Sequence, residues 1–122
     1  MQITQRDLGN ITCLEIQGRI VLEDGADLLR DRVNNLLSLG KRHLLLNMKA
    51  VTYMDTSGLA AMLGVKMSAE REGGTVRLLH LPERMHNLLV ITRLITAFDR
   101  YESEAEAVLG SAAAPAARPV AG

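Results

Sequence analysis

The residues best suited to chemistry stand together at positions 55–58, where the sequence reads Asp-Thr-Ser-Gly. A serine nucleophile elbow requires glycine two residues before the serine and two after it. Here Asp55 lies two residues before Ser57, and Gly58 is adjacent to the serine, so this pattern fails. A retroviral-type aspartic protease requires contiguous Asp-Thr-Gly, but Ser57 separates Thr56 from Gly58, and no second loop of this kind completes a carboxylate pair.

A strand, a polar link and a helix are expected to position these residues. The apolar run at residues 44–46 is typical of a buried strand, and residues 47–52 read as a polar link. Asp, Thr and Ser favour helix N-caps because their oxygens accept the amide protons that a first turn leaves unpaired. We therefore expect a helix to begin at residues 55–57, with the hydroxyl of Ser57 near the surface at the positive end of the helix dipole.

This segment resembles the STAS domain of anti-sigma-factor antagonists. The family element reads Leu-Asn, a short link, Val, two residues, a large apolar residue, Asp, Ser or Thr, Ser, Gly and Leu. The residues that carry the resemblance are Leu46, Asn47, Val51, Met54, Asp55, Thr56, Ser57, Gly58, Leu59 and the Gly64 that follows. The remaining elements agree in order and length, so the resemblance covers residues 1–109.

The resemblance implies a phosphorylation switch at Ser57, because the family serine just before the glycine is phosphorylated by a partner kinase. It implies an anti-sigma-factor antagonist, which binds an anti-sigma factor serine/threonine kinase when unphosphorylated and thereby frees a sigma factor. Phosphorylation then releases the antagonist, and a serine phosphatase of the same pathway resets it. Met54, Asp55, Thr56 and Gly58 are implied to shape the loop or to contact the partner.

One position departs from the family pattern. Many antagonists carry Gly-x-Leu-Asp at the start of the link that precedes the first helix. Here the chain reads Gly-Arg-Ile-Val at residues 18–21, and an acidic pair, Glu23 and Asp24, follows slightly later. Asp24 either replaces the family aspartate on the partner-facing surface or only caps the helix, and both interpretations stay open.

Length, composition and charge bound the function. With 122 residues the chain is expected to form a single domain. Its 14 basic and 14 acidic residues cancel, which argues against a direct nucleic-acid binder, and no apolar stretch approaches the length that spans a membrane. Cys13 is the only cysteine, so no intramolecular disulfide is possible and a cytoplasmic setting is expected.

The hydrophobic pattern by itself predicts a small α/β sandwich with a mixed sheet. The resemblance implies the small STAS fold, with a mixed β-sheet of four to five strands and helices packed mainly on one face. The expected strands are residues 3–7, 11–17, 43–48, 75–79 and a short edge strand at 98–101, and the expected helices follow residues 25, 56, 82 and 103. Residues 110–122 are rich in Ala and Pro and are predicted to be a disordered tail.

The same residues leave room for two functions other than the switch. The domain could be a constitutive STAS subunit or scaffold in a transporter or signalling complex, with Ser57 a contact residue that is never modified. An enzyme is not expected, because Gly73-Gly74 lacks the Lys-Ser/Thr of a phosphate-binding loop. His43, His80 and His86 show no metal-binding spacing, so neither a metal nor another cofactor is expected.

Overall fold

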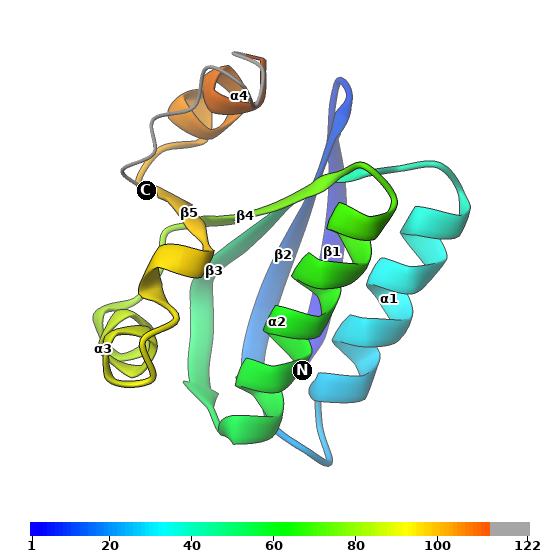
Figure 1. Cartoon of the computed structure of the whole chain (residues 1–122). Helices are drawn as coiled ribbons and strands as arrows, with labels where there is room; N and C mark the ends of the chain where they lie inside the picture. The colour runs from blue at the N-terminus through cyan, green and yellow to red at the C-terminus, as the bar shows by residue number, and fades with distance from the viewer. Residues whose placement is uncertain (113–122) are drawn as a thin grey trace.

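The computed structural model describes residues 1–112 and shows a five-stranded mixed sheet in the order β1-β2-β3-β4-β5 (Figure 1). Strands β1 (Gln2–Leu8) and β2 (Ile11–Ile20) form an antiparallel hairpin. Strands β3 (His43–Met54), β4 (Thr75–Leu79) and β5 (Asp99–Tyr101) continue the sheet in parallel from β2. The predicted hairpin and the mixed sheet are confirmed.

Helices α1 (Ala26–Ser38) and α2 (Thr56–Arg71) lie side by side on one face of the sheet and start at the same end of the molecule (Figure 1). Helix α3 (Glu83–Ile91) and a 3₁₀ turn, η1 (Ile95–Ala97), join β4 to β5. Helix α4 (Glu104–Ala112) packs on the opposite face. The helices therefore lie mainly on one face, as predicted, and the fold is the expected small α/β fold.

The three consecutive leucines at the start of β3 explain how the sheet is buried on both sides. Leu44 and Leu46 point into the main core, which α1, α2 and α3 cover. Leu45 points the other way, into a smaller cluster that includes Ala107 of α4. Successive side chains of a strand face opposite sides of a sheet, so an uninterrupted apolar run is what a strand covered on both faces requires.

The predicted polar link at residues 47–52 is wrong, because β3 continues through it to Met54. This second half of β3 pairs with the end of β2, where Gln17 lies opposite Ala50 and Ile20 lies opposite Met54. Two register shifts interrupt the pairing, and the buried residues of this half fall three apart, at Met48, Val51 and Met54. The usual alternation of a strand is therefore absent from the sequence here.

The C-terminal boundary differs slightly from the prediction. Helix α4 extends to Ala112, so it includes the first three residues of the predicted disordered tail, 110–122. The rest of that segment, residues 113–122, lies outside the described residues. Within residues 1–112, none of the helices combines the length and the apolar composition needed to cross a membrane.

Candidate functional site

Asp55 organises the site by joining the start of α2 to the loop that follows β2. It is the N-cap of α2, with extended backbone angles, and its carboxylate accepts the backbone N–H of Gly58 at 2.9 Å. The second carboxylate oxygen accepts the N–H of Leu22 at 3.2 Å, across the gap between the two loops. The predicted start of this helix at residues 55–57 is confirmed.

These hydrogen bonds keep the carboxylate of Asp55 ionised. The N–H of Gly58 lowers the pKa of this carboxyl most, and the amides of Leu22 and Ser57 add to the effect against an opposing contribution from partial burial. Hydrogen bonds to the charged form of an acid favour that form. Asp55 therefore serves as a fixed negative acceptor that holds the two loops together.

Two glycines let the loops approach the end of β2 closely. A Cβ atom on Gly58 would overlap the carbonyl oxygen of Ile20. Gly25 has a φ of +121°, which side chains rarely adopt, and a Cβ there would lie 2.6 Å from the carbonyl oxygen of Arg19. The first turn of α2 and the loop between β2 and α1 are thus packed against the same strand end.

Ser57 is the second residue of α2 and is half-buried. Its hydroxyl makes no hydrogen bond to any residue that the structure describes. Thr56, the first residue of the helix, is exposed beside it. A helix N-terminus presents unpaired amides and a positive dipole end, so an added anion at this serine meets a favourable local field.

Asp24 lies in the adjoining loop between β2 and α1. The N-cap of α1 is Gly25, without a side-chain hydrogen bond, so the interpretation of Asp24 as a helix cap is wrong. Instead the exposed carboxylate of Asp24 accepts a hydrogen bond from the N-terminal ammonium of Met1 at 2.9 Å. Asp24 shares this loop with Leu22, whose N–H binds Asp55. That Asp24 faces a partner stays a prediction.

The other predicted partner residues divide into two groups. Met54 packs in the main core, and Gly58 is buried against the end of β2, so both residues shape the loop from inside. Asp55 and Thr56 offer polar groups at that loop. Whether a partner contacts any of these residues stays a prediction.

Sequence reasoning missed two apolar residues that border the site. Leu22, whose N–H binds Asp55, is exposed at the tip of the β2–α1 loop. Tyr53 is also exposed, and the guanidinium of Arg19 lies 5.6 Å from the centre of its ring. The sequence signal for Leu22 was its position as an apolar residue directly before the Glu-Asp-Gly turn at residues 23–25. Tyr53 directly follows residues 47–52, the segment misread as a link, and belongs to β3.

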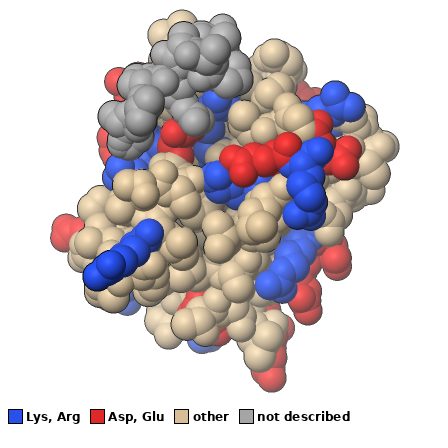
Figure 2. All heavy atoms as spheres, in the orientation of Figure 1, with Lys and Arg blue, Asp and Glu red and all other residues tan. Residues whose placement is uncertain are grey.

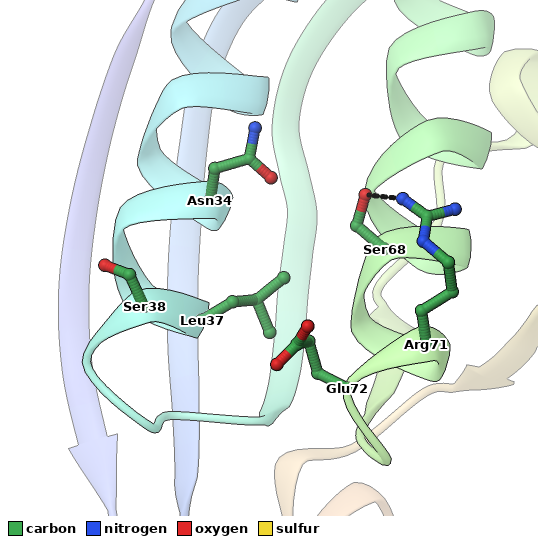
Figure 3. A pocket seen from close by; sticks show the side chains of 6 residues that line it. All are labelled: Asn34, Leu37, Ser38, Ser68, Arg71 and Glu72. Carbon is green, nitrogen blue, oxygen red and sulfur yellow. Dashed lines mark hydrogen bonds between the residues drawn. The ribbon is translucent and has the colours of Figure 1, made fainter.

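A separate hollow lies between the C-terminal ends of α1 and α2 and measures about 260 Å³ (Figure 3). Its lining is Asn34, Leu37, Ser38, Ser68, Arg71 and Glu72, and Arg71 donates a hydrogen bond to the hydroxyl of Ser68 at 3.1 Å. Since Ser57 lies at the opposite end of α2, this hollow is not part of the site.

Among residues 1–112, no three His, Cys, Asp or Glu side chains come together as a metal site would need.

A model of the STAS domain family matches residues 2–107. The anti-sigma-B factor antagonist of Bacillus subtilis (strain 168) is 34% identical over 74 residues, which are 61% of this chain and 67% of that protein. The fold is similar to the anti-sigma factor antagonist SpoIIAA in its unphosphorylated form, with a TM-score of 0.71 and 14% identity over 92% of this chain and 98% of that one.

The fold is equally similar to the phosphorylated form of SpoIIAA from Bacillus. The TM-score is 0.69, with 17% identity over 88% of this chain and 96% of that one. At these identities the structural likeness concerns the fold alone, and it holds for both states of that protein.

Proposed function

The chain belongs to the STAS domain family, and we propose that it acts as an anti-sigma-factor antagonist whose partner binding is controlled by phosphorylation of Ser57. In this proposal the unphosphorylated protein binds an anti-sigma factor serine/threonine kinase in the cytoplasm and frees a sigma factor. Phosphorylation by that kinase releases the protein, and a serine phosphatase resets it. The name of the Bacillus subtilis relative and the existence of a phosphorylated SpoIIAA support the proposal.

The observation that carries the proposal is the contrast between two neighbouring side chains. The carboxylate of Asp55 is engaged by two backbone amides, whereas the hydroxyl of Ser57 at the start of α2 is engaged by no described residue. A kinase that reaches this end of α2 therefore meets an unbonded hydroxyl in the first turn of a helix that Asp55 caps. The protein itself acts as substrate and supplies no catalytic group.

Electrostatics explain how one phosphate acts on the partner and not on the fold. A phosphoserine carries about −1.5 to −2 charges near pH 7, and a helix N-terminus favours such an anion. Asp55 is ionised beside it, and Glu23 and Asp24 lie on the adjoining loop. A docked partner would have to desolvate this concentrated negative charge, so a hundredfold loss of affinity, about 2.7 kcal/mol, is a reasonable expectation.

The test measures binding and phosphorylation of Ser57 variants with purified anti-sigma factor kinases encoded in the source genome. With ATP, the wild type and a Thr56→Ala control should gain one phosphate by peptide mass spectrometry, and Ser57→Ala should gain none. By titration calorimetry Ser57→Ala should bind like the wild type, and Ser57→Asp should bind about a hundredfold more weakly. Equal binding by the Ala and Asp variants would contradict the switch.

The same measurements separate the constitutive-subunit alternative. A stable partner that co-purifies with the protein, and that binds wild type and Ser57→Asp equally with or without ATP, would identify a permanent subunit or scaffold of a transporter or signalling complex. Ser57 would then be a contact residue only.

A further inference from the structure

The side chain of Met1 is fully enclosed, unlike those of the strand that follows it. Every residue of β1, an edge strand of the sheet, is at least partly exposed, whereas the side chain of Met1 is 0% exposed and packs against the main core. Figure 1 places the N-terminus at the end of the molecule where α1 and α2 begin. Met1 lies there beside residues 21–25, the β2–α1 loop.

Two glycines form a seat for Met1. Gly18 has a φ of +104°, and a Cβ atom on it would lie 3.4 Å from the Cα of Met1. A Cβ atom on Gly25 would lie 2.7 Å from the sulfur of Met1. Gly18 belongs to the strand that enters the β2–α1 loop, and Gly25 is the residue at which the loop ends. Met1 therefore packs against both sides of this loop.

A polar contact adds to the packing, since the carboxylate of Asp24 accepts a hydrogen bond from the N-terminal ammonium of Met1 at 2.9 Å. The loop itself is a compact turn in which Val21 and Asp24 exchange two backbone hydrogen bonds of 3.1 Å. Figure 2 shows acidic side chains at the lower end of the molecule, where Figure 1 places this loop. Exposed ion pairs contribute little to stability, so the enclosed side chain of Met1 supplies most of the hold on the loop.

The β2–α1 loop reaches the start of α2 through Leu22. The N–H of Leu22 binds the carboxylate of Asp55 at 3.2 Å, and Asp55 caps the helix in which Ser57 is the second residue. Leu22 lies between positions 18 and 25, the two points of the chain that Met1 touches. A loop that moved away from Met1 would therefore carry this N–H away from Asp55.

We propose that Met1 is a positioning residue for the Ser57 switch, because its side chain holds the β2–α1 loop where Leu22 binds Asp55. The consequence for Ser57 rests on the proposed function, whereas the contact between the loop and Asp55 does not. Without this side chain Asp55 loses the bond to Leu22 but keeps the bond to Gly58 that caps α2. The first turn of α2 therefore stays helical, while the loop beside it is displaced.

The experiment replaces Met1 in the full chain, produced from a fusion whose cleavage leaves residue 1 as the first residue. Met1→Ala removes most of the apolar side chain, and Met1→Leu keeps one of similar size. Ile3→Ala is the matched control, because Ile3 packs against the same core but is not among the atoms nearest to Gly18 and Gly25. Met1→Val takes the place of Met1→Ala if circular dichroism shows the latter to be unfolded.

NMR titration then follows the carboxyl of Asp55 in each variant. In Met1→Ala the pKa of Asp55 should rise toward the ordinary aspartate value of about 3.9, since the amide of Leu22, which helps to lower it, moves away. Met1→Leu and Ile3→Ala should keep the wild-type pKa. A wild-type pKa in Met1→Ala, or an equal rise in Ile3→Ala, would overturn the proposal.

Kinetics with a kinase that phosphorylates the wild type test the consequence for Ser57. Met1→Ala should raise the KM for phosphorylation of Ser57 about tenfold and leave kcat within twofold, because the loop is displaced but the serine stays in the same helical turn. Met1→Leu should restore the wild-type KM. An unchanged KM beside a raised Asp55 pKa would overturn the positioning role. If no kinase phosphorylates the wild type, the proposed function fails, and a raised Asp55 pKa would still show that Met1 holds the loop.

Discussion

At the scale of single residues, the Asp-Thr-Ser-Gly element has two roles. Asp55 and Gly58 hold the structure together, and Ser57 carries a hydroxyl that is available for modification. Asp55 and Gly58 are fixed by close contacts with the loop after β2, and neither can move without separating two parts of the fold. The hydroxyl of Ser57 makes no hydrogen bond to any of the described residues. A phosphate can therefore be added there without breaking a native hydrogen bond of that side chain, which suits a reversible modification.

We predict that Asp55 makes stability depend on pH at the acid side. Its pKa is lowered in the folded chain, so its stabilising contribution is complete above about pH 4, near the ordinary aspartate value, and is lost as the pH falls through its folded pKa. Asp55→Asn keeps an N-cap oxygen but cannot titrate. In thermal melts, the variant should lose less stability than the wild type between pH 6 and pH 3.

Asp31→Asn is the control for this experiment, because Asp31 is exposed on α1 and no described backbone amide hydrogen-bonds to its carboxylate. Its melting profile should follow that of the wild type. An Asp55→Asn profile with the wild-type acid slope would show that the capping bonds do not distinguish the two charge states.

At the scale of elements, the sequence predicted an element correctly where residues within that element alone determine its structure. The start of α2 was predicted correctly because the N-cap preference of Asp55 is a property of the residue itself. The second half of β3 was not, because its partner strand shifts register and leaves Lys49 and Ala50 exposed together. The hollow between the end of β3 and α3, which is lined by residues such as Met54 and Leu88, could not be predicted either, since it depends on how the two elements meet in space.

The two glycines of α2 provide a paired prediction at this scale. Gly58→Ala should destabilise the protein by about 1–3 kcal/mol, because its Cβ would overlap the backbone of Ile20, which cannot turn aside as a side chain can. Gly64→Ala has open space around its Cβ and lies inside the helix, so it should stabilise by about 0.5–1 kcal/mol. Urea unfolding of both variants measures the difference, and equal effects would refute the close packing at Gly58.

At the scale of the whole molecule, the sheet separates two apolar clusters of unequal size. The main core joins α1, α2 and α3 to the sheet, whereas α4 contributes to the smaller cluster through its buried Ala107. Arg6 of β1 adds an ion pair to Glu104 at the start of α4, but both side chains are about 40% exposed to water, which weakens such a pair. Helix α4 is therefore expected to open locally before the rest of the domain.

Ala107→Asp tests this independence. An unpaired carboxylate in the smaller cluster is costly to bury, so α4 should leave the sheet and its amides at residues 104–109 should exchange faster, while those of β2 and β3 keep their protection. Ala105→Asp, on the exposed side of α4, should leave the exchange rates of these amides unchanged.

By contrast, Leu46→Ala in the main core should lower global stability by about 2–5 kcal/mol and reduce protection in every element. Hydrogen exchange followed by mass spectrometry separates the two patterns. If Ala107→Asp exposed the sheet as completely as Leu46→Ala, α4 would be part of the same cooperative unit as α1 and α2.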